Sequence, residues 1–482
     1  MTLDQAERTA VAATGDTEMS ERRRRWALVL LAAALALDVS GVAVINSALP
    51  SIGDEFNVSE SSLQWTMTAY ATAFAGCLLL GGRCADVLGR RKIFAMGIAL
   101  FALASLGAAL APNLAVLIVA RAVQGVGAAL SGPASLALLS QIFPEGPARN
   151  KAVAVYSATG AASFSGGLVI GGVLTDFIGW RSVFALSVVI GAVVLCAVRA
   201  LLPAGQRLRQ PLDLPGAVLV TAGLGLIVYG VTRGSDIGWT ATETVLALAL
   251  AVVCLIAFVV REKRHSDPLL PLNIFGSSPV RAATLTAAVY YTGVLGLLFF
   301  APLYMQGTLG YSPLESSVAV VPMGVIVAIS AQITGRFMTP ARYKALMVAS
   351  LLLIGVGDAL WARTDAGSSY WTDMLPGLIL MSIGQGVGIG AMTTATLSGL
   401  PQHQHGVAGA VQVTAQQLGS SIGVAVLVAV AAGASSQLAG AHAAYLTIGA
   451  LCVVAALAVV LMRFPRENTS AAADTAAEPV TT

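Results

Sequence analysis

The stretch GRCADVLGRRK, residues 82–92, decides the fold, because it places charged side chains between two apolar segments of membrane-spanning length. Those segments are 63–81 and 93–111, so the connection between them has room only for a tight turn. Gly82 and Gly89 permit a positive φ or the close approach of a neighbouring backbone. So much charge is unusual for a passive linker, and the spacing GxxxDxxGRRK predicts a specific role at the membrane edge.

The charged members of this stretch have defined physical uses. Asp86 can cap a helix or pair with a cation, while Arg90, Arg91 and Lys92 can bind anionic lipid headgroups or the C-termini of helices. The plain alternative is an ordinary positively charged hairpin on the cytoplasmic side of a membrane protein. The combined spacing of glycines and charges favours the specific role.

The whole chain has the composition of a membrane protein. Of its 482 residues, 56% are hydrophobic and 11% are charged, against about 25% charged in soluble domains. The net charge of +3 does not indicate a nucleic-acid partner, because the basic residues are distributed by topology and form no basic domain. The five cysteines show no CxxC spacing, so neither a disulfide framework nor a metal site is expected. We therefore expect an all-α polytopic protein.

A transmembrane helix needs about 20 mainly apolar residues. This criterion predicts fourteen spans, and the first is of full spanning length, so no cleavable signal is expected. The predicted spans are 26–49, 63–81, 93–111, 114–137, 152–175, 182–202, 214–233, 242–260, 281–305, 315–335, 345–363, 374–397, 407–432 and 441–462.

The positions of Lys and Arg orient these spans. With a cytoplasmic N-terminus, only Arg181, Arg233 and Arg363 fall on the outer side and Arg121 lies within a span, which leaves 23 of the 27 basic residues inside. An odd number of spans would put this alternation out of phase. The pattern predicts a multi-pass protein of the cytoplasmic membrane with both termini in the cytoplasm.

The predicted spans group as six, two and six. We expect two six-helix bundles joined by an inserted hairpin, an arrangement typical of secondary transporters with a substrate site near the midplane. The expected parts are a cytoplasmic tail (1–25), the first bundle (26–202), a linker (203–213), the two-helix insert (214–262), a second linker (263–280), the second bundle (281–463) and a disordered cytoplasmic tail (464–482).

Two ionisable residues lie deep in the first bundle. Asp38 is near the middle of the first span, and Arg121 is about a third of the way into the fourth. Each costs about 2.5 to 3.5 kcal/mol if it faces lipid, and opposite charges on two spans of one bundle can pair and so reduce this cost. The pair is either a structural salt bridge or a proton site, in which the carboxyl gains and loses a proton as access alternates. We favour the proton site.

Other polar residues in spans are weaker candidates. Asp358 lies near the outer end of the eleventh span, beside Trp361 and Arg363, and is expected at the interface, with a role as a second acid as the alternative. For any single polar residue in a span, helix packing is the more common role. The candidates for a substrate cavity are Asn46, Gln64, Trp65, Tyr70, Gln124, Tyr290, Tyr291, Gln412 and Gln416.

Small residues in the fifth span predict close helix packing. Gly167 and Gly171 form a GxxxG pair, and Gly172 follows directly. Such a surface either joins helices within one bundle or lets the two halves of a transporter rock against each other. Gly419 and Gly423 repeat the pattern in the thirteenth span.

Together these motifs resemble the major facilitator superfamily, and within it the fourteen-span drug:proton antiporters. The stretch 82–92 is similar to that superfamily's loop between spans two and three. The chain departs from the antiporter pattern at Leu168, where the family has proline, and this departure bears on the choice between export and uptake. Further matches are Asp38, Asn46 and Pro50 in span one, Arg121, Gln124 and Gly125 in span four, and Gly167, Gly171 and Gly172 in span five, followed by Trp180, Arg181 and Phe184.

The resemblance implies a rocker-switch transporter in which Asp38 and Arg121 handle the proton. External protons would neutralise Asp38 and release a bound hydrophobic or amphipathic drug outward. The partners implied are protons, a lipophilic small molecule and membrane lipids, with no cofactor, and a monomer is expected. The residues implied as a latch between the two halves are Gly82, Asp86, Gly89, Arg90 and Arg91.

Other classes of protein fit the sequence less well. Neither the P-loop pattern GxxxxGK[ST] nor HExxH occurs, so we expect neither ATP-driven transport nor an enzyme of the zinc-protease type. A proton-linked uptake carrier for a sugar or organic acid is the main alternative. A non-transporting membrane sensor is a second one, although the loops are too short for a soluble signalling domain.

Overall fold

A computed structural model describes residues 19–143, 147–203, 213–265, 268, 270, 272–339, 341–398, 400 and 405–464, apart from some helical side chains, Asp86 among them. Several predicted parts lie wholly or partly outside these residues. They are the N-terminal tail before Met19, most of the linker 203–213, parts of the linker 263–280 and the C-terminal tail beyond Phe464.

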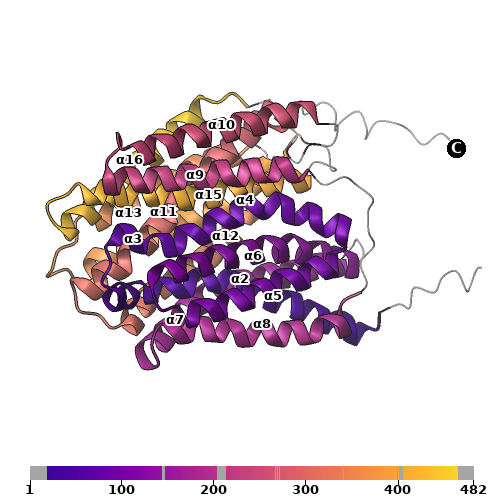
Figure 1. Cartoon of the computed structure of the whole chain (residues 1–482). Helices are drawn as coiled ribbons and strands as arrows, with labels where there is room; N and C mark the ends of the chain where they lie inside the picture. The colour runs from indigo at the N-terminus through magenta and orange to yellow at the C-terminus, as the bar shows by residue number, and fades with distance from the viewer. Residues whose placement is uncertain are drawn as a thin grey trace, which may run out of the picture. The chain divides into compact units, whose positions relative to one another are not determined.

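The described residues are helical almost throughout (Figure 1), and each predicted span overlaps a helix. The helices are α2 (Glu21–Phe56), α3 (Glu60–Leu63), α4 (Trp65–Leu88), α5 (Arg90–Ala109), α6 (Leu114–Ile142), α7 (Pro147–Phe177), α8 (Arg181–Leu201), α9 (Leu214–Ile237), α10 (Thr242–Arg264), η1 (Leu272–Gly276), α11 (Ser278–Gly307), α12 (Pro313–Arg336), α13 (Tyr343–Trp361), η2 (Tyr370–Met374), α14 (Leu375–Leu397), α15 (His405–Ala432) and α16 (Gln437–Leu461).

Twelve of the helices in the described part of the chain are long and apolar enough to cross a membrane. Helix α4 is not among the twelve, and α9 qualifies only as a shorter apolar helix over Pro215–Val231. The fold is therefore an all-helical, multi-pass membrane fold. The count of fourteen spans stays a prediction.

Helix α4 runs through most of the stretch that we expected to be a tight turn. It ends at Leu88, and Gly89 alone separates it from α5, with a φ of 100° that favours glycine. Residues 83–88 contain no glycine or proline, so nothing in them interrupts the helix. The expectation of a tight turn is correct only for Gly89.

Helix α2 begins ahead of the predicted start at Trp26. The hydroxyl of Ser20 accepts a hydrogen bond from the main-chain N–H of Arg23 (3.4 Å), and Glu21 lies in the first turn. A serine cap and an acidic first turn both favour a helix N-terminus. The last residues of the predicted N-terminal tail are therefore helical.

Contacts divide the chain into two compact units. The first unit is Met1–Phe258 with Leu298–Gly324, and the second is Val259–Leu297 with Val325–Thr482. In the first unit α2 packs on α7 and α8, while α4 and α5 pack on α6; in the second unit α13 packs on α14 and α16. The helix α9 of the predicted insert packs on α4 in the first unit, where the Thr221 hydroxyl donates to the main-chain oxygen of Gly76 (2.9 Å).

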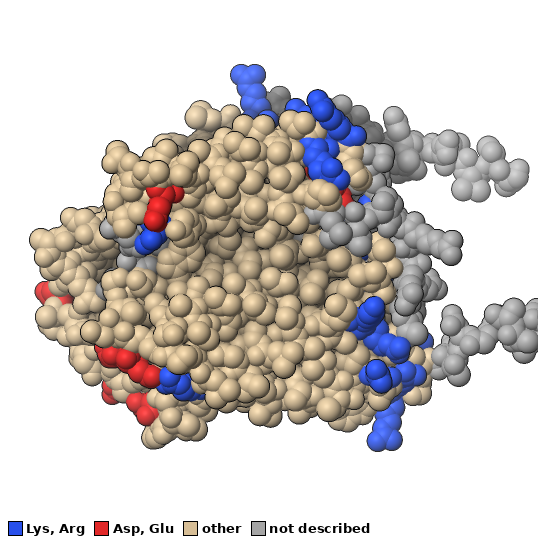
Figure 2. Space-filling view, in the orientation of Figure 1, with Lys and Arg blue, Asp and Glu red and all other residues tan. Residues whose placement is uncertain are grey.

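Charged side chains of the first unit gather at the ends of its helices. Figure 2 shows Lys and Arg at the end where α2 begins and α8 ends, and acidic residues at the opposite end. The basic end includes Arg22 to Arg25 in the first turns of α2, and the acidic end includes Asp54 and Glu55 in its last turn. The helices between these ends present mainly apolar side chains, as expected for a layer within a membrane.

Candidate functional site

Arg121, on α6, is the centre of a buried polar site in the first unit. Its side chain is 1% exposed. Nε donates to the main-chain oxygen of Thr66 (2.7 Å), while Nη1 donates to the main-chain oxygen of Gly41 (3.2 Å) and to Oε1 of Gln124 (2.9 Å). These charge-assisted hydrogen bonds compensate for the removal of the guanidinium from water. Arg121 thereby joins α6 to α2 and α4.

Gln124 extends this site towards α5. Its Nε2 donates to the hydroxyl of Ser105 (2.7 Å), which in turn donates to the main-chain oxygen of Phe101 (2.8 Å). Gln124 and Ser105 are both buried. The chain of hydrogen bonds fixes the orientation of the Gln124 amide, because its oxygen faces Arg121 and its nitrogen faces Ser105.

Asp38, on α2, has different partners. It is 8% exposed, and its Oδ2 accepts a hydrogen bond from the hydroxyl of Ser131 (3.1 Å). Its Oδ1 is buried and has no hydrogen-bond partner among the described residues. No ion pair joins Asp38 to Arg121 in the described structure, so the structural salt bridge, the alternative to a proton site, is not formed here. Nε and Nη1 of Arg121 donate instead to main-chain oxygens and to Gln124.

Tyr70, on α4, connects the two charged residues. Its hydroxyl donates to the main-chain oxygen of Asp38 (3.4 Å), and its ring lies 4.6 Å from the guanidinium carbon of Arg121. The close fit depends on Gly125 of α6, because a Cβ there would collide with the main-chain oxygen of Tyr70. Asp38 and Arg121 thus belong to one site, with a fixed cation on one side and a carboxyl with a free oxygen on the other.

The basic residues after Gly89 contact other helices of the same unit, and Arg91 reaches the C-terminal end of α8. Nη1 of Arg90 donates to the main-chain oxygen of Ala137 on α6 (3.2 Å), and Nη1 of Arg91 donates to that of Leu202 at the end of α8 (3.3 Å). Cations at helix C-termini are favourable. Gly82 lies within α4, and a Cβ added to it would be 3.7 Å from the side chain of Pro133. The side chain of Asp86 is not among those that the structure describes.

The glycines of α7 pack against two other helices of the first unit. A Cβ on Gly167 would lie 3.2 Å from Ser40 and Ala43 of α2, and one on Gly171 would lie 2.8 Å from the main-chain oxygen of Val44. A Cβ on Gly172 would lie 2.6 Å from the hydroxyl of Ser317, at the start of α12. The GxxxG pair therefore brings the α7 backbone onto α2, while Gly172 faces α12.

The candidate cavity residues fall into both units. In the first unit Asn46, Gln64, Tyr70 and Gln124 are buried, and both amide atoms of Gln64 are without a hydrogen-bond partner among the described residues. Trp65 packs instead near Tyr229 of α9, with 6.2 Å between ring centroids.

In the second unit Tyr290 and Gln412 are buried, whereas Tyr291 and Gln416 are partly exposed. The Tyr290 hydroxyl donates to the main-chain oxygen of Gln385 (3.2 Å), and the rings of Tyr290 and Tyr291 are 5.2 Å apart. The glycines of α15 that repeat the small-residue pattern pack on α11, where Thr292 donates to the main-chain oxygen of Gly419 (2.8 Å).

Asp358 of α13 is also buried, with 0% exposure. We expected this residue at the interface because it lies close to the end of its span. The sequence did not predict its burial, since position along a helix does not reveal which face of the helix is covered. The residues around Asp358 belong to α11, α13 and α16 of the second unit.

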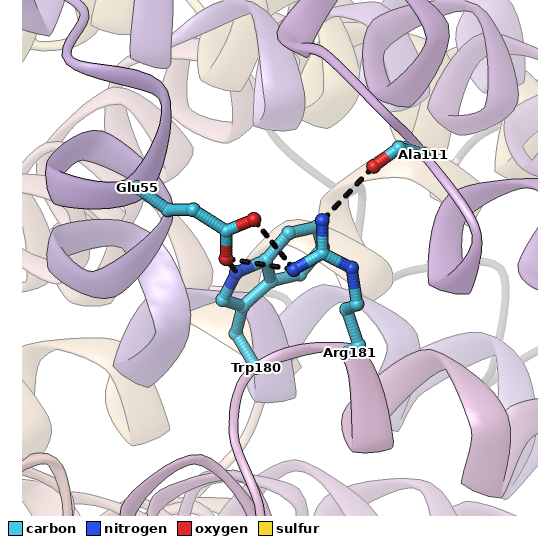
Figure 3. Close-up of polar contacts among 4 residues, drawn as sticks. All are labelled: Glu55, Ala111, Trp180 and Arg181. Atoms are coloured by element: carbon cyan, nitrogen blue, oxygen red, sulfur yellow. Dashed lines mark hydrogen bonds and ion pairs between the residues drawn. The ribbon is translucent and has the colours of Figure 1, made fainter.

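A second polar cluster lies at the acidic end of α2 (Figure 3). Nη1 of Arg181 lies 2.7 Å from both carboxylate oxygens of Glu55, and Nη2 donates to the main-chain oxygen of Ala111 (3.1 Å). The indole N–H of Trp180 donates to the same carboxylate (2.7 Å), and the Arg181 guanidinium lies 4.3 Å from the Trp180 ring.

This Glu55–Arg181 cluster ties the end of α2 to the α5–α6 and α7–α8 connections. Sequence reasoning identified Trp180 and Arg181 within a motif but missed Glu55, which lies beyond the predicted end of the first span. The signal that could have found it is the single acidic pair Asp54 and Glu55 at the end opposite the basic one.

Twelve candidate spans among the described residues, with a buried acid and a buried arginine held by neighbouring helices, define the class as a polytopic helical membrane protein. The family model of the Major Facilitator Superfamily matches residues 29–424 of the chain. The chain therefore belongs to this superfamily, whose members are carriers and not enzymes.

Several relatives cover most of the chain. The puromycin resistance protein pur8 of Streptomyces alboniger is 40% identical over 426 residues, which are 87% of this chain and 84% of the relative. The cephamycin export protein CmcT of Amycolatopsis lactamdurans is 36% identical over 85% of both chains. The lincomycin resistance protein of Streptomyces lincolnensis is 33% identical over 92% of both.

Proposed function

We propose that the protein is a proton-coupled exporter of hydrophobic or amphipathic drugs, antibiotics or secondary metabolites, which works by alternating access across the cytoplasmic membrane. The observation that carries this proposal is the Asp38 carboxyl, whose Oδ1 is buried and has no hydrogen-bond partner among the described residues. A carboxyl in such a place is far more stable neutral than ionised, so changes in access to water change its protonation. Proton binding at Asp38 would thus be linked to conformation.

Arg121 supplies the fixed charge in this proposal. Its hydrogen bonds to three oxygens keep the guanidinium in place, so it does not neutralise Asp38 by direct pairing. Tyr70 contacts both residues and transmits a movement of α2 to α4 and α6. Protonation of Asp38 from the outside would accompany release of the drug, and loss of the proton to the cytoplasm would restore binding.

The proposed class of transported compound is based on the relatives that match this chain over most of their own length. They are named for resistance to puromycin or lincomycin and for export of cephamycin. The candidate substrate contacts are the buried polar residues Asn46, Gln64 and Gln124 in the first unit, and Tyr290 and Gln412 in the second. The buried, unpartnered amide of Gln64 supports this assignment, because a ligand that entered would satisfy it.

The stretch around Gly89 is proposed as the conformational latch, with fourteen spans and both termini in the cytoplasm. Arg90 contacts α6 at Ala137 and Arg91 contacts the end of α8, which supports a role in holding the first unit as a rigid body. Replacement of Asp86 by Asn or of Arg90 by Ala is expected to slow turnover with drug binding kept. Unchanged turnover would count against a latch, whereas loss of binding alone would indicate misfolding instead.

Everted membrane vesicles test export directly. A proton gradient is formed by respiration, and puromycin, lincomycin or a cephamycin is then added while the internal pH is followed. An exporter is expected to dissipate part of the gradient as drug enters the vesicle and protons leave. Export is contradicted if none of these drugs changes the proton gradient relative to vesicles without the protein. If an organic acid or a sugar changes the gradient in right-side-out vesicles instead, the protein is an uptake carrier.

A further inference from the structure

Asp358 is the buried acid that the proposed mechanism leaves unused. It lies on α13 with 0% exposure, and neither carboxylate oxygen has a hydrogen-bond partner among the described residues. Asp38, in comparison, retains a hydrogen bond from Ser131 and 8% exposure. Asp358 is therefore the more isolated of the two acids.

Helix α11 packs against the Asp358 carboxyl at Gly293, which has no side chain. A Cβ placed on Gly293 of α11 would lie 3.1 Å from Oδ2 of Asp358, 2.7 Å from Ile354 and 3.2 Å from Ile448 of α16. Glycine is required for this approach, since any side chain would push α11 away. The carboxyl thus faces an apolar contact between α11, α13 and α16.

Few ionisable groups face this position. Cys452 of α16, which is buried, packs against α13 near Asp358, since a Cβ on Gly355 would lie 2.8 Å from its own Cβ. Tyr445, also on α16, faces Trp361 with 6.0 Å between ring centroids, and His442 contacts the main-chain oxygen of Thr364 (2.6 Å). The described residues provide no cation within ion-pair distance of Asp358.

Such surroundings decide the charge of the carboxyl. An ionised carboxylate without hydrogen bonds or a counter-ion costs many kcal/mol in an apolar interior, so the group holds a proton instead. It can ionise only if water reaches it, and that requires α11 to separate from α13 and α16. A change of conformation and the release of a proton are then the same event.

We propose that Asp358 is a second proton-carrying acid of the transporter, loaded in this conformation and unloaded when α11 moves away from α13 and α16. This inference rests on the proton coupling proposed above and places a second carrier in the second unit. It makes transport depend on two acids, one in each unit.

Infrared spectroscopy of the full chain in lipid bilayers tests this with the proton alone as the probe. The expected result is a carbonyl band of a protonated carboxyl that Asp358→Asn removes, that Asp38→Asn leaves in place, and that disappears reversibly as the pH is raised. A band that is absent, or that persists until the protein unfolds, would overturn the proposal. If Asp358→Asn does not fold, Asp358→Glu replaces it, with a shifted band expected and an unchanged spectrum as the contrary result.

A transport measurement separates this inference from the proposed function. In proteoliposomes, the protons moved per puromycin are obtained from the membrane potential that just stops net flux. Asp358→Asn is expected to move one proton fewer than the unmodified protein, and an unchanged ratio would refute the second carrier. If the unmodified protein moves no protons with puromycin, the proposed function fails for this drug, and the infrared titration still decides the state of Asp358.

Discussion

A single arginine illustrates how a charge is tolerated inside this membrane protein. Arg121 is 1% exposed, yet its guanidinium reaches two main-chain oxygens, one amide oxygen and one aromatic ring. No other side chain has the planar donors for all of these contacts. Arg121 therefore provides a fixed charge and also connects α2, α4 and α6 through its hydrogen bonds.

Replacement of Arg121 by Lys is expected to destabilise the protein by about 2 to 4 kcal/mol, because a single ammonium leaves buried oxygens unpaired. Thermal unfolding in detergent measures this loss. The control is Arg199→Lys on α8, an exposed arginine whose replacement is expected to change stability by less than about 0.5 kcal/mol. Equal melting temperatures for the two variants would contradict the role given to Arg121.

Gly89, between α4 and α5, has a backbone conformation that only glycine adopts without strain. Its φ of 100° is strained for any residue with a Cβ, so Gly89→Ala is expected to cost about 1 to 2 kcal/mol. Gly132→Ala on α6 is the matched control, since a Cβ there meets nothing within 4 Å. Chemical or thermal unfolding of both variants decides the matter, and a neutral Gly89→Ala would show that the turn has another conformation.

Residue patterns along the chain predicted some of these features and missed others. The buried positions of Asp38 and Arg121 could be predicted because charge in an apolar run is visible in a sequence. Their partners could not, since most are main-chain oxygens that every residue carries. The burial of Asp358 was missed because it depends on which neighbouring helix covers α13, which is a property of the packed fold.

Packing of whole helices depends on the glycines of α7. A Cβ on Gly171 would lie 2.7 Å from the hydroxyl of Ser47 and 2.9 Å from Cα of Val44, so alanine must push α7 away from α2. The small residues of the fifth span predicted such a surface, and the structure assigns its GxxxG pair to α2 within one unit. The rocking surface between halves remains the alternative for Gly172.

Gly171→Ala is expected to destabilise the protein by about 1 to 3 kcal/mol and to lower the rate of drug export. The control is Gly166→Ala on the same helix, where a Cβ meets nothing within 4 Å and alanine favours the helix by up to about 1 kcal/mol. Melting temperatures are expected to move in opposite directions for the two variants. A shared direction would mean that the contact with α2 does not limit substitution.

The Glu55–Arg181 cluster joins the ends of several elements, and its strength can be measured. The two side chains are 42% and 41% exposed, so solvent screening reduces their interaction. A double-mutant cycle with Glu55→Gln and Arg181→Gln is expected to give a coupling of about 0.5 to 1 kcal/mol that falls in high salt. The more exposed pair of Arg25 and Glu21 serves as the comparison, and a coupling no larger than that pair's would argue against a role in holding the helix ends.

At the scale of the whole molecule, the central proposal is that buried acids link proton binding to conformation. The superfamily is established by a match over residues 29–424, and the relatives that cover most of the chain are named for resistance or export. Length and composition predicted an all-helical membrane fold correctly. The direction of transport and the number of spans depend on orientation in a membrane, which helix packing alone does not encode.

The most direct test replaces Asp38 by Asn, which keeps the shape of the side chain and removes its proton exchange. Puromycin accumulation in everted vesicles is measured with an imposed proton gradient, together with exchange of internal for external puromycin without a gradient. The control is Asp54→Asn at the exposed end of α2, which is expected to behave like the unmodified protein. We predict that Asp38→Asn retains exchange but loses gradient-driven accumulation at least tenfold, and accumulation equal to that of the unmodified protein would contradict proton coupling at Asp38.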